Sequence, residues 1–260
     1  MKRFLATLTI ALLAVSGFEA AYAKDSDSIH FGVDPSYAPF ESKSADGKLV
    51  GFDIDLGDEI CKHLHAKCVW VENDFDGMIP ALKARKFDGI LSSMMVTPKR
   101  AQEVSFSDKL YAAQSRLIVK RGSPLQPTAE SLAHKKVGVQ QGTVEETYAK
   151  TYWGPKGVEV IPYQNQDLVY ADLKLGRLDA SLQDGVQASL GFLKTPNGAD
   201  YTFSGASLKG ADILGAGTAI GLRKGDDELR GRIDDAISAI RKDGTYDRLQ
   251  KKYFDFDIYN

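Results

Sequence analysis

The chain has 260 residues, of which 43% are hydrophobic and 26% are charged. These values are ordinary for a globular protein, so they exclude an intrinsically disordered or fibrous chain. The 33 Lys and Arg residues are balanced by 35 Asp and Glu residues, which gives a net charge of −2. Nucleic acid is therefore excluded as a partner, because its binding depends largely on the neutralisation of phosphates.

The first 23 residues have the three parts of a secretory signal peptide. Lys2 and Arg3 form the charged start, and residues 4–15 form an apolar run that is too short to span a membrane comfortably. Ala21 and Ala23 then flank Tyr22 in the small-x-small pattern of a signal-peptidase site. We expect residues 1–23 to be cleaved after Ala23 and the rest of the chain to be exported. A buried N-terminal helix is the alternative.

The two cysteines enclose a short loop. Cys61 and Cys68 are separated by a segment that also contains His63 and His65, and four such side chains could bind zinc at this spacing. An oxidising compartment outside the cytoplasm favours a disulfide over free thiols. We therefore predict a Cys61–Cys68 disulfide and no metal, with the zinc site as the alternative.

Strand and helix patterns alternate along the chain, which is typical of α/β layers with mostly parallel sheets. In the first part of the chain, the sequence predicts strands over 29–33, 68–71 and 87–91 and a helix over 54–64. It also predicts a helix that is capped by Asn73 or Asp74 and reaches residue 84. After the third strand it predicts a helix capped by Thr97, with Pro98 at the first helical position.

A weak internal repeat suggests two similar lobes. Residues 82–91 (LKARKFDGIL) align with residues 173–182 (LKLGRLDASL), and both read as a helix end, a turn and a strand. Further upstream, residues 32–34 align with residues 138–140, each at the end of a first strand. A chance likeness is the alternative, because this helix–turn–strand pattern is common.

Polar residues follow the predicted strands. Ligands of open α/β sheets bind beyond the carboxyl ends of the strands. These positions hold Asp34 and Ser92-Ser93 in the first half, and Gln140-Gln141 and Gln183-Asp184 in the second. If two lobes face each other across these ends, they enclose a polar cleft.

Two helix starts lie next to this predicted cleft. Residues 143–146 (TVEE) have the form of a capping box, which leaves the N–H groups of Val144 and Glu145 available to an anion. Arg100 falls in the first turn of the helix capped by Thr97, where the helix dipole disfavours a cation. Arg100 therefore indicates a partner anion, with a solvated arginine as the alternative.

Enzyme motifs are missing from the sequence. It contains no Gly-x-Ser-x-Gly elbow, no Walker loop and no His-Glu-x-x-His pair. This weakly favours a binding protein.

Several long segments resemble one family. The segment 51–61 (GFDIDLGDEIC) resembles the signature of the periplasmic amino-acid-binding proteins of ABC importers, solute-binding protein family 3. Further matches are 34–42 (DPSYAPFES), 107–113 (SDKLYAA), 243–246 (DGTY) and 252–255 (KYFD). The resemblance runs from about residue 29 to the C-terminus and is to the histidine-binding and lysine/arginine/ornithine-binding members.

The resemblance implies a two-lobed α/β fold in which each lobe is a mostly parallel sheet flanked by helices. Two hinge strands would join lobe 1, residues 24–111 plus 218–260, to lobe 2, residues 112–217. The implied function is the capture of a cationic L-amino acid (arginine, lysine, ornithine or histidine) in the periplasm and its delivery to the membrane permease of an ABC importer. A monomer without cofactors is expected.

The resemblance also assigns ligand-binding residues. Arg100 would bind the α-carboxylate, helped by the N–H groups of Ser93 and Val144, and Asp184 would bind the α-ammonium group with Ser93 assisting. The remaining assignments concern the ligand side chain, which would lie between Tyr37 and Phe75 and meet Asp34, Ser92 and Gln140 at its polar end.

The chain departs from the family pattern at three positions. Met95 replaces a serine near the α-ammonium group, and Val144 and Glu145 replace a threonine and a glutamine. Val144 keeps its N–H for a carboxylate, whereas Glu145 adds negative charge. The alternative function is an exported enzyme on the same scaffold, such as a cyclohexadienyl or arogenate dehydratase, because such enzymes also resemble this family.

Overall fold

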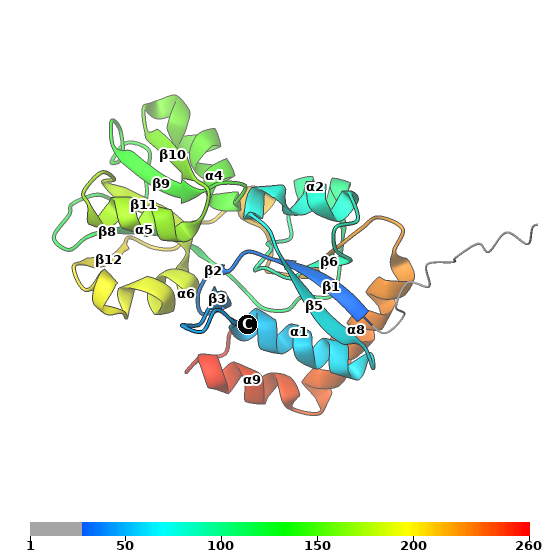
Figure 1. The fold of residues 1–260 in the computed structure, drawn as a ribbon. Helices are drawn as coiled ribbons and strands as arrows, with labels where there is room; N and C mark the ends of the chain where they lie inside the picture. The colour runs from blue at the N-terminus through cyan, green and yellow to red at the C-terminus, as the bar shows by residue number, and fades with distance from the viewer. Residues whose placement is uncertain (1–27) are drawn as a thin grey trace, which may run out of the picture.

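The computed structural model describes residues 28–260, and these form two lobes that lie side by side (Figure 1). The predicted signal peptide, residues 1–23, lies outside the described residues. Each lobe is built on one five-stranded sheet.

The sheet of the first lobe has the order β5-β1-β6-β13-β7. Its strands are β5 (Lys67–Glu72), β1 (Ser28–Val33), β6 (Gly89–Ile90), β13 (Gly221–Leu222) and β7 (Ser105–Phe106). The strand β1 pairs in parallel with β5 and β6, whereas β13 runs antiparallel to β6 and β7. The sheet is therefore mixed: β13 runs opposite to β5, β1, β6 and β7, which share one direction.

The second sheet repeats this arrangement with the order β10-β9-β11-β8-β12. Its strands are β10 (Glu159–Tyr163), β9 (Lys136–Gln140), β11 (Ala180–Asp184), β8 (Ser115–Lys120) and β12 (Tyr201–Ser204). Here β8 runs opposite to β10, β9, β11 and β12, so the reversed strand has the same fourth place as β13 in the first sheet. The shared topology supports the internal repeat rather than a chance likeness.

Residues that the repeat aligns also have the same local structure. Asp88 accepts a hydrogen bond from the backbone N–H of His30 at 3.1 Å, and Asp179 accepts one from Lys136 at 2.8 Å. Each aspartate thus ties a helix–strand turn to the strand that the repeat aligns, β1 in the first sheet and β9 in the second. Arg85 and Gly176, three residues earlier, both have left-handed backbone angles, with φ of 60° and 69°.

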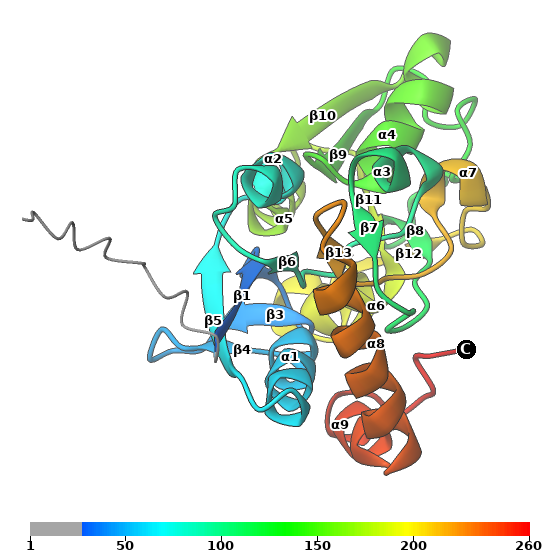
Figure 2. The same ribbon diagram turned by 90° about the vertical axis from the view of Figure 1, so that its right-hand side faces the viewer.

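Helices cover both faces of the first sheet (Figure 2). The helices α1 (Phe52–His63), α8 (Asp227–Lys242) and α9 (Thr245–Tyr253) pack together on one face, over a core that includes Phe31, Phe52 and Ile237. The helix α2 (Met78–Lys83) covers the other face through Met78 and Leu82, and α3 (Pro98–Glu103) lies on the same side.

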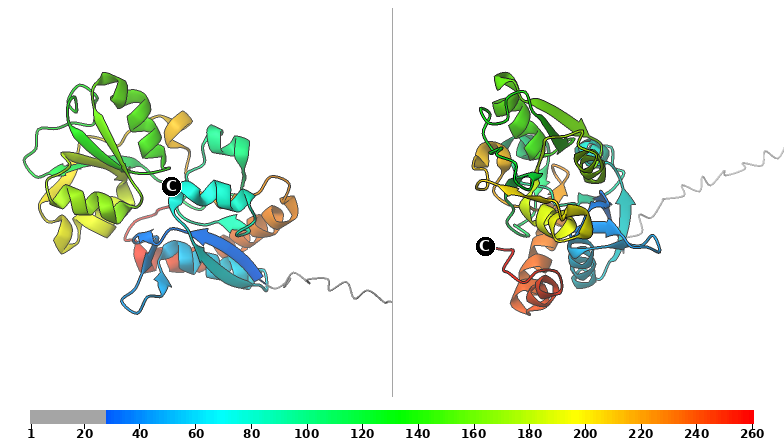
Figure 3. Two further views of the ribbon diagram at one scale, coloured as in Figure 1. Left: turned by 45° about the horizontal axis from the view of Figure 1, so that its top comes forward. Right: turned by 90° about the vertical axis from the view of Figure 1, so that its left-hand side faces the viewer.

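The second sheet also lies between two helical layers (Figure 3). On one side lie α4 (Val144–Tyr148) and the π-helical turn Ala149–Trp153 that continues it. On the other side lie α5 (Gln166–Lys174), α6 (Gly185–Gln187) and the turn Ala188–Leu193. The short helix α7 (Ala211–Leu214) precedes the return of the chain to the first sheet.

Most of the predicted elements form, with one exception at a helix start. Thr97 caps α3 by accepting a hydrogen bond from the N–H of Arg100, with Pro98 at the first helical position, as predicted. The predicted cap by Asn73 or Asp74 is wrong. The chain there begins with a 3₁₀ turn over Phe75–Gly77 that has no side-chain cap, and the Asn73 amide donates to the carbonyl of Asp74.

The predicted Cys61–Cys68 disulfide is confirmed, and it joins the end of α1 to the start of β5. The zinc alternative is wrong, because both sulfur atoms are engaged with each other. His63 lies 3.5 Å from Asp243 instead of facing a metal site.

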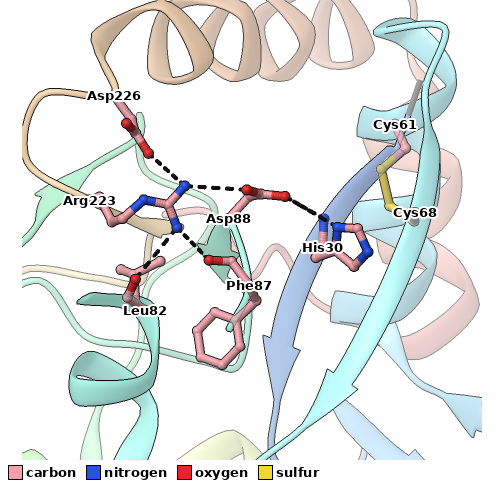
Figure 4. A network of polar contacts seen from close by, with 8 residues as sticks. All are labelled: His30, Cys61, Cys68, Leu82, Phe87, Asp88, Arg223 and Asp226. Carbon is pink, nitrogen blue, oxygen red and sulfur yellow. Dashed lines mark hydrogen bonds and ion pairs between the residues drawn. A yellow bond between two sulfur atoms is a disulfide. The ribbon is translucent and has the colours of Figure 1, made fainter. Parts of the chain in front are cut away.

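A buried ion-pair network holds the first sheet together (Figure 4). Arg223 is 8% exposed. It pairs with Asp88 at 3.2 Å and with Asp226 at 2.8 Å, and it donates to the carbonyls of Leu82 and Phe87. Because Asp88 also holds His30, this network links the edge of α2 to β1, β6 and the start of α8, and we assign it a structural role.

A three-stranded sheet, β2 (Ser36–Tyr37), β3 (Glu41–Lys43) and β4 (Leu49–Val50), lies between β1 and α1 in the chain. No helix within residues 28–260 is long and apolar enough to cross a membrane.

Candidate functional site

A cavity lies where the carboxyl ends of the strands from both sheets meet, and the empty space in it and at its open mouth is about 480 Å³. Every residue that the sequence predicts to bind the ligand lines this cavity. Its full lining is Asp34, Tyr37, Phe40, Glu41, Phe75, Ser92, Ser93, Met95, Arg100, Tyr111, Ala113, Gln140, Thr143, Val144, Glu145, Asp184 and Thr218.

Asp34 and Gln140 connect the two sheets across the cavity. Asp34 follows β1 and Gln140 ends β9, and the Gln140 amide donates to Asp34 Oδ2 at 2.8 Å. The other oxygen of Asp34 accepts from the Ser36 hydroxyl at 2.7 Å, and the N–H of Asp34 donates to Ser92 Oγ at 3.0 Å. Burial raises the pKa of the Asp34 carboxyl, and the hydrogen bonds from Ser36 oppose part of that rise.

Arg100 reaches the cavity from the first turn of α3. Its guanidinium group donates to the carbonyl of Met95 at 2.8 Å and to that of Gly142, beyond β9, at 3.0 Å. It lies 5.4 Å from the centre of the Phe75 ring. No carboxylate of residues 28–260 forms an ion pair with it, and burial lowers its pKa to about 10. Arg100 is half-buried, and although the charge of Glu145 acts on it, no carboxylate of the described residues lies within ion-pair distance, which favours a further anion in the cavity.

Asp184 ends β11 and caps α6. Its Oδ1 accepts hydrogen bonds of 2.8 Å from the N–H groups of both Val186 and Gln187. Its Oδ2 is buried and has no hydrogen-bond partner within the described part of the chain. Burial raises the pKa of Asp184 to about 7, and the negative charge of Glu145 adds to the rise. A buried carboxylate oxygen without a hydrogen-bond partner favours a cationic donor in the cavity.

Glu145 adds a further buried carboxylate to the same end of the cavity. It is 6% exposed and accepts a 2.6 Å hydrogen bond from the Ser115 hydroxyl. Burial raises its pKa, while the nearby Arg100 charge lowers it. Burial raises the pKa of the Tyr37 hydroxyl well above its usual range, and the charges of Glu145 and Asp184 raise it further.

The start of α4 differs in detail from the predicted capping box. Thr143 Oγ accepts from the N–H of Glu146 at 3.1 Å, as predicted. Glu146 itself binds the N–H of Gly142 at 2.6 Å rather than that of Thr143. The first helical residues, Val144 and Glu145, have no preceding helical carbonyl for their N–H groups.

The predicted contact between the Ser93 N–H and the ligand carboxylate is wrong. The N–H of Ser93 donates to Asp53 Oδ2 at 2.8 Å, so it does not help Arg100 to bind a carboxylate. Ser93 has φ of 50°, and its hydroxyl lies 3.0 Å from that of Tyr111. Only the hydroxyl and the carbonyl of Ser93 therefore remain for a ligand.

The sequence interpretation missed six residues of the lining: Phe40, Glu41, Tyr111, Ala113, Thr143 and Thr218. Glu41 is the most informative of these, because it is 1% exposed and accepts a 2.9 Å hydrogen bond from Ser92. Its position in the segment DPSYAPFES, between the predicted strand over 29–33 and the predicted helix over 54–64, gave no indication of burial.

Comparisons with known proteins agree with this geometry. The model of the bacterial extracellular solute-binding proteins, family 3, matches residues 29–256. Histidine-binding periplasmic protein of Escherichia coli K12 is 53% identical over 259 residues, which cover 100% of this chain and 99% of that protein. Lysine/arginine/ornithine-binding periplasmic protein of the same strain is 54% identical with the same coverage. The structure of an ancestral arginine-binding protein bound to arginine has a TM-score of 0.82 and 36% identity, covering 88% of this chain and 98% of that one.

Proposed function

Since the chain belongs to the bacterial extracellular solute-binding proteins, family 3, we propose that it captures a cationic L-amino acid for an ABC importer. Relatives that are more than half identical over the whole chain bind histidine or lysine, arginine and ornithine in the periplasm. The protein is accordingly a periplasmic binding protein. The dehydratase alternative is not favoured, because these full-length relatives are binding proteins and not enzymes.

The observation that carries the ligand class is the charge distribution of the cavity. Arg100 forms no ion pair with a carboxylate of the described residues, although the charge of Glu145 acts on it, and Asp184 Oδ2 has no donor among them. An amino-acid backbone supplies a carboxylate for the first and an ammonium group for the second. We assign the α-carboxylate to Arg100 and the N–H of Val144, and the α-ammonium group to Asp184 with the Ser93 hydroxyl or carbonyl.

The far end of the cavity would take the cationic side chain. Once the zwitterion is matched by Arg100 and Asp184, the carboxylate of Asp34 remains as a surplus negative charge, held by Gln140 and Ser36. A buried carboxylate without a counter-ion is costly, and a guanidinium, ammonium or imidazolium group relieves that cost. Tyr37 and Phe75 would pack against the alkyl part of the side chain, with Ser92 beside its polar end.

Glu145 and Met95 affect which derivatives of a basic amino acid can bind in the cavity. An opine carries a second carboxylate on its α-nitrogen, and the cavity offers Asp184 and Glu145 at that end but no cation besides Arg100 in its lining. We therefore propose a free amino acid rather than an opine. Met95, 9% exposed, supplies an apolar wall where the family pattern has a serine.

The delivery cycle follows from the two lobes. We propose that residues 24–111 with 218–260 and residues 112–217 move as two bodies, which close over the ligand and then dock on the permease as a monomer. The two lobes contact each other in this structure: besides the Asp34–Gln140 bond, the Gln164 amide donates to Asp74 at 2.8 Å, and such contacts would hold the closed form together. The signal peptide proposed for residues 1–23 agrees with the periplasmic location of the relatives.

A thermal-shift screen of all amino acids tests this function. Protein stripped of ligand by unfolding and refolding should melt at higher temperature with arginine, lysine, ornithine or histidine, because a ligand at 100 times its Kd adds about 2.7 kcal/mol of stability. Prephenate and arogenate should neither raise the melting temperature nor be converted. A shift with acidic or neutral amino acids alone would overturn the proposal.

A further inference from the structure

Two carboxylates lie under the cavity without any cation beside them. Glu41 on β3 is 1% exposed, and Asp53 in the first turn of α1 is 0% exposed. Neither forms an ion pair with any Lys, Arg or His of residues 28–260. The proposed contacts with the ligand's carboxylate and ammonium groups leave both of them unused.

Both carboxylates hold the serines that follow β6. Asp53 accepts 2.8 Å hydrogen bonds from the N–H of Ser93 and from the hydroxyl of Tyr111. Glu41 accepts from the hydroxyl of Ser92 at 2.9 Å and from that of Ser93 at 3.3 Å. The pair therefore fixes the two residues whose remaining polar atoms face the cavity.

The backbone of Ser93 needs this support. Its φ of 50° lies in the left-handed region, which costs a residue other than glycine roughly 1 kcal/mol or more. The hydrogen bonds from its N–H to Asp53 and from its hydroxyl to Glu41 stabilise that conformation. Loss of either acceptor would let Ser93 relax and would move its carbonyl and hydroxyl relative to the ligand.

The charge of the pair follows from its surroundings. Burial raises the pKa of Asp53 to about 6 and that of Glu41 well above its usual range, and the charge of Asp53 raises the pKa of Glu41 further. The other titratable groups that face the pair are Asp34, Tyr37, Tyr111 and Tyr246, none of which is a cation. Two buried carboxylates in such a setting cannot both be ionised.

We propose that Glu41 is a positioning residue that stays protonated and donates to Asp53, so that the pair carries one negative charge and fixes Ser92 and Ser93 beneath the ligand. A protonated Glu41 donates one hydrogen bond and still accepts from Ser92 through its other oxygen. Glu41 then does not count as a counter-ion for a cationic ligand, although it lines the cavity. The part that concerns the ligand rests on the proposed function.

Ligand-free protein tests the protonation independently of any ligand. In carboxyl ¹³C NMR, Glu41 should keep the chemical shift of a protonated acid at pH 6, where exposed glutamates such as Glu130 are ionised. The melting temperature of Glu41→Gln should also rise relative to wild type between pH 5 and 8. Burial places the folded pKa above the unfolded value, so wild type loses stability as the pH rises through this interval, whereas the amide does not titrate. A titration of Glu41 with an ordinary glutamate pKa would overturn the proposal.

Calorimetry with arginine tests the positioning role. Glu41→Gln should bind within about threefold of wild type at pH 7, because the amide reproduces the donor and acceptor of the protonated acid. Glu41→Ala should bind at least tenfold more weakly, since Ser92 loses its acceptor and Asp53, which holds the N–H of Ser93, loses its donor. A tenfold loss in Glu41→Gln would make Glu41 a charged counter-ion and overturn the proposal. If arginine and the other basic amino acids fail to bind wild type, the proposed function fails, while the NMR result still decides the protonation of the pair.

Discussion

The carboxylate of Asp34 accepts a 2.8 Å hydrogen bond from the amide of Gln140, which lies 106 positions further along the chain. Both residues occupy the same place in their own lobes, because the internal repeat aligns residues 32–34 with residues 138–140 at the ends of β1 and β9. The ends of β1 and β9 thus place a carboxylate and an amide next to each other between the lobes. This contact places the proposed end of the ligand side chain where the two copies of the repeat face each other.

Removal of the Arg100 side chain should abolish measurable binding of basic amino acids. The proposed ion pair with the α-carboxylate is desolvated, and truncation of one partner of such a pair costs about 2–5 kcal/mol. Arg100→Lys should also weaken binding, because a single ammonium group cannot form a bidentate contact. Calorimetry measures both variants, with Arg232→Ala on the exposed face of α8 as the control. A loss of less than fivefold in Arg100→Ala would place Arg100 outside the site.

Much of this site was predictable from the sequence, for a physical reason. Asp34, Ser92 and Asp184 each follow an apolar strand, and the carboxyl ends of parallel strands meet at one edge of a sheet. Glu41 and Asp53 were not predictable in this way. An aspartate in the first turn of a helix is ordinary, and only the fold brings it against Glu41 and Ser93.

The same limit explains the atomic errors of the sequence interpretation. The N–H of Ser93 looked available to a ligand because nothing in the local sequence shows that Asp53, 40 positions earlier, accepts its hydrogen bond. The absent cap before α2 has a local cause, because the chain enters that helix through a 3₁₀ turn.

Replacement of Asp34 by asparagine should change selectivity more than overall binding. Asp34→Asn removes the surplus negative charge but keeps the size of the side chain and an oxygen for the Gln140 amide. Binding of arginine or lysine should weaken by more than about 1.4 kcal/mol, a factor of ten. Any neutral amino acid that binds should be barely affected, and calorimetry with both classes measures the difference. Equal losses for both classes would give Asp34 a structural role instead.

Arginine binding should weaken as the pH falls below 7. Burial, together with the charge of Glu145, raises the pKa of ligand-free Asp184 to about 7. The α-ammonium group needs the ionised form, so each pH unit below 7 should cost up to about tenfold in affinity. Titration calorimetry between pH 5.5 and 8.5 measures this dependence.

The variant Glu145→Gln serves as the matched control for that pH dependence. It removes one cause of the raised pKa of Asp184, so the decline in arginine affinity should begin at a lower pH than in wild type. Affinity that stays constant from pH 8.5 to 5.5 in wild type would argue against Asp184 as the partner of the α-ammonium group.

A single methyl group at Gly191 should block closure of the lobes. A Cβ atom there would lie 2.3 Å from the carbonyl oxygen of Ala38, which belongs to the other lobe. Gly191 lies in the helical turn Ala188–Leu193, where alanine is better tolerated than glycine, so the second lobe should keep its fold. We expect Gly191→Ala to bind arginine at least tenfold more weakly, as measured by calorimetry.

Gly231→Ala provides the control for this prediction. Gly231 lies within α8, and a Cβ atom there would meet nothing within 4 Å. The control should bind as wild type does and gain up to about 1 kcal/mol of stability. In small-angle X-ray scattering, arginine should compact wild type and the control but not Gly191→Ala. Full compaction of Gly191→Ala would show that closure tolerates the added methyl group.

The central claim is that the cavity recognises an L-amino acid by its zwitterion and by a positive charge on its side chain. Calorimetry of ligand-stripped protein with arginine and citrulline tests it most directly, because the two have nearly the same shape and differ in the side-chain charge. The surplus carboxylate of Asp34 predicts that arginine binds at least tenfold more tightly, a difference of about 1.4 kcal/mol or more. Equal affinity for the two ligands, or tighter binding of citrulline, would contradict the claim.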